Sequence, residues 1–115
     1  MDLSQLAHKL RNFAQERDWE QFHSPKNLSM ALSVEVSELV EHFQWLTEEQ
    51  SSALEAEELS DVAEEIADIQ IYLTRLADRL GVDIEHAVLK KLAVNASKYP
   101  VAKAHGNALK STKFK

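Results

Sequence analysis

The clearest pattern in the chain lies between Ser52 and Gly81, where apolar residues recur at alternating steps of three and four. This spacing predicts a long amphipathic helix that packs closely along its length and ends at Gly81, a favourable C-cap. The stripe comprises Leu59, Val62, Ile66, Ile69, Leu73, Leu76 and Leu80. Ile71 and Tyr72 lie off the stripe on different sides, which indicates that a second face is buried, as in an oligomer.

Three further helices are predicted by capping residues and apolar spacing. Asp2 caps a first helix that runs to about Arg17, with one apolar face formed by Leu3, Leu6, Leu10 and Phe13. Ser24, followed by Pro25, starts a second helix that continues to about Leu46. Asp83 caps a last helix that ends near Lys98, before Tyr99–Pro100. Overlapping capping boxes at Thr47–Gln50 and Ser52–Glu55 predict a break between the second helix and the long one.

Composition supports the same all-α class. Only two glycines and two prolines interrupt 115 residues, so helix is favoured nearly everywhere, and a chain of this length is one domain. We expect a helical domain over residues 1–100 and a basic tail over residues 101–115. Because there is no cysteine and no apolar run near the roughly 20 residues that span a bilayer, we expect a cytoplasmic protein without a membrane partner.

Charge narrows the possible partners. The net charge of −6 opposes binding to a nucleic-acid backbone, so we expect no nucleic-acid partner. The acidic residues concentrate in residues 35–68, whereas residues 90–115 contain seven lysines and no acid. This asymmetry suits a site with an acidic, metal-binding half and a basic, phosphate-binding half.

Paired acids at i,i+3 spacing provide the candidate chemistry. Glu35 and Glu38 lie at the edge of the apolar face of the second helix, where an ionised carboxylate is costly unless it is paired or bound to a cation. The long helix carries two such pairs, Glu58 with Asp61 and Glu65 with Asp68. Spacing alone does not choose between them, and either could be a solvated acidic face.

Several motifs, taken in order, resemble the MazG-like all-α nucleoside triphosphate pyrophosphohydrolases, and among them the short dCTP pyrophosphatase type. The resemblance covers roughly residues 3–100. Its motifs are RDWEQFH at 17–23, P-x-N-L at 25–28, E-V-x-E-L at 35–39, F-Q-W at 43–45, E-E-x-x-D-I at 64–69, Y-L at 72–73, K-x-x-x-N at 91–95 and K-Y-P at 98–100. The Tyr72-Leu73 pair selects Glu65 and Asp68 over the earlier acid pair.

The resemblance implies a compact four-helix subunit that assembles into a homotetramer, a dimer of dimers with sites built between chains. It also implies Mg²⁺-dependent cleavage of a nucleoside triphosphate between the α- and β-phosphates, which serves nucleotide pool house-cleaning. The implied metal ligands are Glu35, Glu38, Glu65 and Asp68, and Glu38 is also the candidate general base. The implied phosphate contacts are Lys91, Asn95 and Lys98. The candidates for the base and sugar pocket are Trp19, His23, Trp45 and Tyr72.

The preferred nucleotide and two rival functions stay open. Members of the family specific for dCTP tend to carry a histidine in the first helix where this chain has Leu10, so dATP or another deoxynucleotide is an alternative to dCTP. A di-iron carboxylate bundle needs two Glu-x-x-His units on inward-facing helices, but only Glu20 and His23 have that spacing. The other rival is a helical oligomerisation or regulatory module whose acids are merely solvated.

Overall fold

The computed structural model describes residues 1–114, in which every regular element is helical, and this confirms the predicted all-α class. The elements are α1 (Leu3–Glu16), the 3₁₀ turn η1 (Glu20–Phe22), α2 (Pro25–Glu41), α3 (Glu48–Ser51), α4 (Ala56–Leu80), α5 (Ile84–Lys98), α6 (Val101–Ala104) and η2 (Ser111–Lys113). None of the helices in the described residues is both long enough and apolar enough to cross a membrane.

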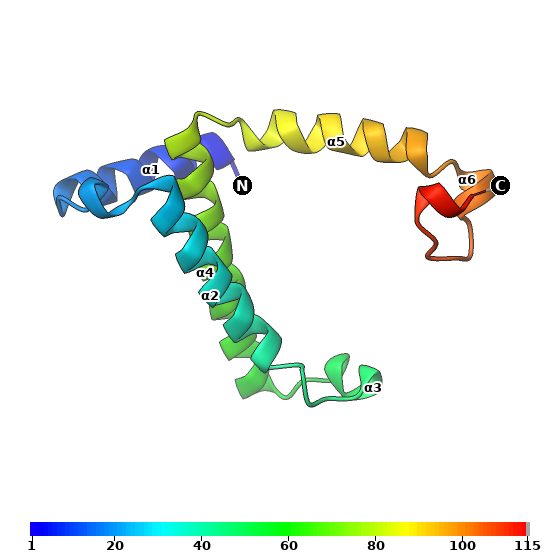
Figure 1. Cartoon of the computed structure of the whole chain (residues 1–115). Helices are drawn as coiled ribbons and strands as arrows, with labels where there is room; N and C mark the ends of the chain where they lie inside the picture. Colours follow the sequence, from blue (N-terminus) through cyan, green and yellow to red (C-terminus); the bar gives the residue numbers. More distant parts are fainter. Residues whose placement is uncertain (115) are drawn as a thin grey trace. The chain divides into compact units, whose positions relative to one another are not determined.

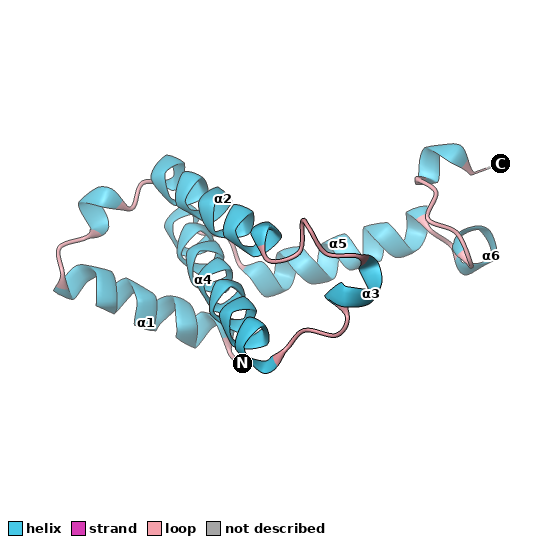
Figure 2. Cartoon of the chain, turned by 90° about the horizontal axis from the view of Figure 1, so that it is seen from below, coloured by secondary structure: helices cyan, strands magenta, loops and turns pink. Residues whose placement is uncertain are grey.

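The chain divides into two compact units, Met1–Val82 and Asp83–Lys115. In the first unit α2 and α4 lie side by side and make the most extensive helix contact, and α1 packs on α4 as well (Figures 1 and 2). The contacts show that α2 and α4 are antiparallel, because the Glu35 carboxylate meets Glu65 while His42, one heptad later, meets Glu58, one heptad earlier. This register decides which acids of the two helices face each other.

Local sequence set most helix ends as predicted. The side chains of Asp2, Ser24 and Asp83 accept hydrogen bonds from the first backbone N–H groups of α1, α2 and α5. The capping box of Thr47 and Gln50 is present, with both side chains bonded to the other residue's backbone. Gly81 ends α4 with φ of +69°, a left-handed conformation that glycine adopts without steric cost.

Two predicted boundaries were wrong. The second helix ends at Glu41 instead of Leu46, because the N–H groups of His42 and Phe43 bond three residues back and tighten the last turn. The predicted cap at Ser52 does not start the long helix either. Ser52 instead closes α3 with its own N–H, and α4 begins after Glu55, which makes no side-chain capping bond.

The apolar stripe of α4 is wider than its packing face. Val62 is buried, whereas the four stripe residues that recur every seventh position are 40–56% exposed: Leu59, Ile66, Leu73 and Leu80. Packing against α1 and α2 therefore uses only part of the stripe. The other part forms an apolar row along the outside of the unit.

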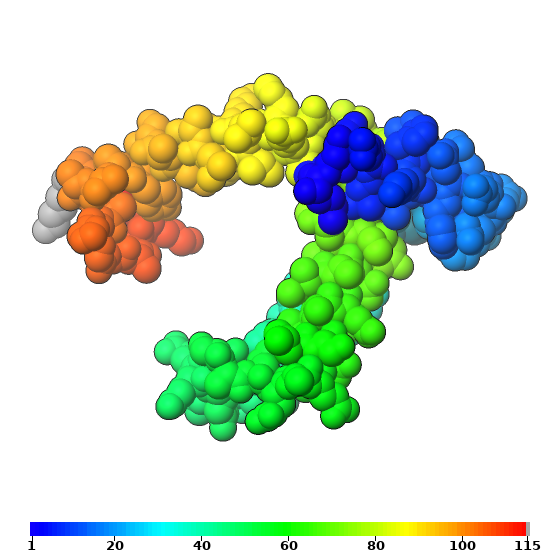
Figure 3. Space-filling model, turned by 180° about the vertical axis from the view of Figure 1, so that it is seen from behind, coloured from blue at the N-terminus to red at the C-terminus, as the bar shows by residue number. Residues whose placement is uncertain are grey.

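The second unit has little buried surface of its own. Its main element is α5, which has no buried residue and leads into the short segment formed by α6 and η2 (Figure 3, yellow to red). The rings of Tyr99 and Phe114 meet edge to face with centroids 5.6 Å apart and hold that segment to the end of α5. The predicted division at residue 100, between a helical domain and a basic tail, stays a prediction.

Candidate functional site

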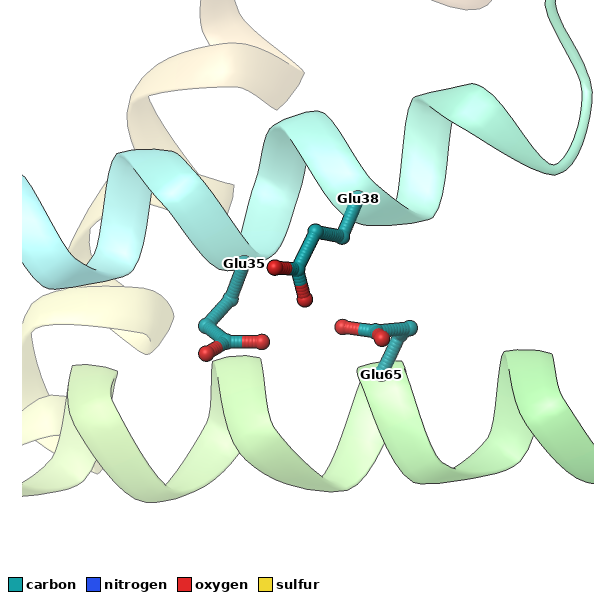
Figure 4. A group of neighbouring side chains, drawn as sticks. All are labelled: Glu35, Glu38 and Glu65. Atoms are coloured by element: carbon teal, nitrogen blue, oxygen red, sulfur yellow. The ribbon is translucent and has the colours of Figure 1, made fainter.

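Three glutamates from two helices meet between α2 and α4. Glu35 and Glu38 project from α2, and Glu65 projects toward them from α4 (Figure 4). One carboxylate oxygen from each residue lies within 4.8 Å of the others. The i,i+3 spacing places the first two on one helix face, and the antiparallel register brings the third opposite them.

The three carboxylates of this cluster lie close together, and two of their buried oxygens have no hydrogen-bond donor beside them in the described part of the chain. Oε2 of Glu35 and Oε2 of Glu65 are both buried, and neither has a hydrogen-bond partner among the described residues. Burial, contact with the Glu65 carboxylate and the nearby charge of Glu38 together raise the pKa of Glu35 to about 7. Without a cation, Glu35 is therefore protonated in a large fraction of molecules near neutral pH.

The fourth predicted ligand lies close to the cluster but outside the group of three. Asp68 is half-buried on α4, one turn after Glu65, and its charge contributes to the raised pKa of Glu35. The alternative acid pair, Glu58 and Asp61, lies outside this group, and Glu58 contacts a histidine instead. Glu58 lies 2.9 Å from Nδ1 of His42, and this contact is the largest cause that raises the pKa of that histidine.

An aromatic cavity opens between α1, η1, α2 and α4. Its volume is about 210 Å³, and its lining residues are Leu10, Phe13, Trp19, His23, Leu28, Ile71, Tyr72 and Arg75. Trp19 makes edge contacts with both Phe13 and His23, which fixes the three rings relative to one another. The cavity thus gathers three of the four predicted pocket residues.

The remaining predicted residues lie elsewhere in the single chain. Trp45 is not among the residues that line the cavity, and it is 86% exposed in the turn after α2. Lys91, Asn95 and Lys98 are exposed on α5, in the second unit, and their i,i+4 and i,i+3 spacing puts them on one helix face. The predicted roles of these four residues stay predictions.

Sequence reasoning missed a buried arginine in the wall of the cavity. Arg75 is 3% exposed on α4, and its guanidinium contacts three groups: Nη1 bonds Asp78 at 3.1 Å, Nε bonds His23 at 3.2 Å, and Nη2 lies 3.5 Å from Glu20. Arg11 of α1 also binds Asp78, through two bonds of 2.6 and 3.1 Å. The sequence did contain a signal for this buried arginine: Arg75 stands between apolar stripe residues and is followed at i+3 by Asp78, a possible ion-pair partner.

The fold and site define a class: a helical protein with a carboxylate cluster and an adjacent aromatic cavity. Residues 30–114 match the MazG-like family, which is more than half of the chain, so the protein belongs to that family. A pyrophosphatase from Archaeoglobus fulgidus has the same fold, with a TM-score of 0.79 and 39% identity over 84% of this chain and 91% of that one.

Animal proteins named dCTP pyrophosphatase 1 are similar as well. The bovine protein is 49% identical over 102 residues and the human protein 45% identical over 104 residues, which is 87% and 89% of this chain. The matched regions make up 60% and 61% of those relatives, so the chain spans less than two thirds of their length.

Proposed function

We propose that the protein is a Mg²⁺-dependent pyrophosphohydrolase that cleaves deoxynucleoside triphosphates between the α- and β-phosphates and releases a nucleoside monophosphate and pyrophosphate. The observation that carries the proposal is the cluster of Glu35, Glu38 and Glu65, with two buried oxygens that lack a partner. Buried charge of one sign is stable only with a cation or after protonation. The names of the similar bovine, human and archaeal proteins support the same reaction.

The donor set suits Mg²⁺. All three clustered groups are carboxylates, and Mg²⁺ is a hard ion that takes oxygen ligands and shares its shell between protein carboxylates, water and substrate phosphates. Asp68, half-buried one turn from Glu65, is the fourth ligand in this proposal. When bound, Mg²⁺ would neutralise phosphate charge and lower the pKa of an attacking water.

The protein residues then divide the remaining tasks. Glu35, Glu38, Glu65 and Asp68 hold the cation. A carboxylate oxygen of Glu38 also accepts the proton of the attacking water. Lys91, Asn95 and Lys98 share one face of α5 and bind the phosphates, since lysine ammonium and amide groups donate hydrogen bonds to phosphate oxygens. Positioning and charge stabilisation account for most of the catalysis in phosphoryl transfer.

The cavity is the proposed site for the base and sugar. Trp19, His23 and Tyr72 lie in its wall, and stacking of a base on an aromatic ring contributes about 1 to 3 kcal/mol. Leu10 also lies in this wall, so the side of the cavity formed by α1 is apolar. We propose dCTP as the preferred substrate, with dATP as the alternative to be tested beside it.

Self-association is part of the proposal. The outer row of α4, formed by Leu59, Ile66, Leu73 and Leu80, recurs at heptad spacing along three heptads and has no cover in the described residues. Such a row is the packing surface of helix-to-helix assembly. A second copy of the chain would cover it, and we propose a homotetramer in which Trp45 and the α5 residues contribute to a neighbour's site.

The test is Glu38→Gln, with pyrophosphate release measured on dCTP, dATP and the other canonical and modified deoxynucleoside triphosphates in the presence of Mg²⁺. Loss of a general base lowers turnover about 100-fold or more, and helicity and oligomeric state should stay unchanged. Glu64→Gln is the matched control, because Glu64 is an exposed neighbour of the cluster. Absence of pyrophosphate release from every nucleotide by the unmodified protein would refute the proposal and favour a non-enzymatic module.

A further inference from the structure

The contact between Arg75 and His23 fixes the chemistry of one wall of the cavity. Nε of Arg75 donates a hydrogen bond to Nδ1 of His23, with the two nitrogens 3.2 Å apart. A guanidinium keeps all its protons in proteins, so its Nε is always a donor. Nδ1 of His23 must therefore be the acceptor, and it cannot carry a proton while this bond exists.

A neutral imidazole holds one proton, and with Nδ1 excluded that proton is on Nε2. We infer that Arg75 is a positioning residue that locks His23 in the neutral Nε2–H form, so that His23 offers a hydrogen-bond donor to the nucleobase in the cavity. This inference rests on the proposed function for the identity of the ligand. The protonation state of His23 follows from its contact with Arg75 and does not depend on the proposed function.

The groups around His23 keep it neutral. Burial lowers the pKa of His23 first, and the positive charges of Arg75 and Arg79 lower it further, while Glu20 has the opposite effect. Arg79 donates to the backbone carbonyl of His23 at 3.1 Å and does not touch the ring nitrogens. The two arginines thus act differently: both oppose protonation of the ring, but only Arg75 selects the tautomer.

Arg75 is itself held in place. Its Nη1 bonds Asp78, and that carboxylate also receives the two-bond contact from Arg11 of α1. With 3% exposure, the guanidinium has no room to turn toward solvent. The linked contacts from Arg11 through Asp78 to Arg75 therefore hold the ring of His23 against both α1 and α4.

The locked donor defines what the cavity recognises. His23 and Arg75 share the lining with apolar and aromatic groups. Because Nδ1 of His23 is bonded to Arg75, we assign Nε2 as the nitrogen that a ligand meets. A base that turns a carbonyl oxygen or an unprotonated ring nitrogen toward it gains a hydrogen bond. A base that turns an amino group toward it leaves two donors facing each other, which costs binding free energy.

The state of His23 can be measured without nucleotide or metal, by ¹⁵N-detected NMR of the imidazole nitrogens near pH 7.5. We expect Nδ1 unprotonated and Nε2 protonated in the unmodified protein. Arg75→Met should raise the pKa of His23 and leave its ring exchanging between two tautomers. Arg79→Met is the matched control: it should raise the pKa while Nδ1 stays an acceptor.

Two results would overturn the inference. One is a proton on Nδ1 in the unmodified protein. This measurement tests the inference even if the Arg75→Met protein does not fold. The other is a folded Arg75→Met protein whose imidazole nitrogen shifts match those of the unmodified protein. Neither result depends on hydrolysis, so a failure here is distinct from a failure of the proposed function.

A kinetic comparison tests the donor itself. His23→Phe should raise KM for dCTP and dATP about three- to tenfold, the size of one neutral hydrogen bond, with a smaller change in kcat. His23→Gln keeps an N–H donor on a side chain of similar reach and should recover part of the loss. An unchanged KM in His23→Phe would contradict the role of His23, even if the tautomer is as expected.

Discussion

Two clusters of charged residues join α4 to a neighbouring helix, and they differ in how their buried charges are compensated. Around Glu35 and Glu65, carboxylates of the same sign meet and two buried oxygens have no partner in the described chain. Around Arg75, opposite charges meet, and Asp78 accepts hydrogen bonds from both Arg11 and Arg75. Nη2 of Arg75 is buried without a hydrogen bond among the described residues, but the carboxylate of Glu20 lies 3.5 Å from it. Buried like charges without partners therefore indicate a ligand site, whereas a network of opposite charges holds the helices in place.

The largest effect on stability should come from the compensated network. Asp78→Ala removes the shared partner of two arginines. The buried guanidinium of Arg75 then keeps its bond to His23, but its one remaining acidic neighbour among the described contacts is Glu20 at 3.5 Å. We expect a loss of about 3 kcal/mol in the free energy of unfolding, as for other broken buried pairs. Urea unfolding measures it.

Glu16→Ala is the control for that substitution. Glu16 lies 3.6 Å from Arg17 in an exposed pair, so its loss should change stability by about 0.5 kcal/mol or less. Equal effects of the two substitutions would mean that burial of Arg75 does not distinguish its network from surface charge.

A smaller effect of opposite sign should come from the acidic cluster. Glu35→Gln removes one of the like charges, so the metal-free protein should become more stable by about 1 kcal/mol, a value reduced for partial screening by solvent. The same substitution should abolish most of the rise in Tm that Mg²⁺ gives the unmodified protein. Differential scanning fluorimetry with EDTA or with Mg²⁺ measures both changes.

Lys26→Gln provides a charge-changing control on α2, because Lys26 is exposed near the start of the helix. A Glu35→Gln protein that is less stable than the unmodified protein without metal would contradict the view that the cluster is uncompensated. An undiminished Mg²⁺ effect would show that the cation binds elsewhere.

The smallest effect is a difference in pH dependence between the two clusters. Glu35 has a pKa raised from 4.5 to about 7, so the folded state binds the extra proton and stability falls as pH rises through that window. Asp78 has a lowered pKa because of Arg11, so its contribution is complete above pH 3.8 and is lost at lower pH. The two slopes therefore have opposite signs.

The gap in stability between Glu35→Gln and the unmodified protein should accordingly widen from pH 5 to pH 7.5 without metal. Unfolding curves at four pH values in that range, with EDTA present, measure it. A gap that is constant across the range would mean that Glu35 does not titrate there.

Much of the fold followed from local sequence. The caps at Asp2, Ser24 and Asp83, the box at Thr47 and the stop at Gly81 depend on residues within one helical turn, and all were confirmed. The end of the second helix did not follow in this way. Its last turn tightens at His42 and Phe43, in the segment where the chain leaves α2 for α3, and periodicity continued past that point.

The candidate site followed only in part. Spacing placed Glu35 and Glu38 on one face but could not choose between Glu58 and Glu65 as their partner, because both lie beside the same stripe. The structure brings Glu65 to the cluster and Glu58 to His42. Helical spacing could not make this choice, because it depends on the register between two helices. The family resemblance, through Tyr72-Leu73, had selected Glu65 from the sequence.

The helical class, most helix ends and the i,i+3 pairing of acids followed from the amino-acid sequence alone, since these depend on neighbours within a turn. The family resemblance selected Glu65 as the partner acid, but helical spacing did not. Contacts between helices set the rest: Arg75 lies buried beside His23, and four of the seven stripe residues of α4 face outward. The physical reason is that burial and compensation of charge arise from contacts between residues far apart in the chain, such as Arg11 with Asp78.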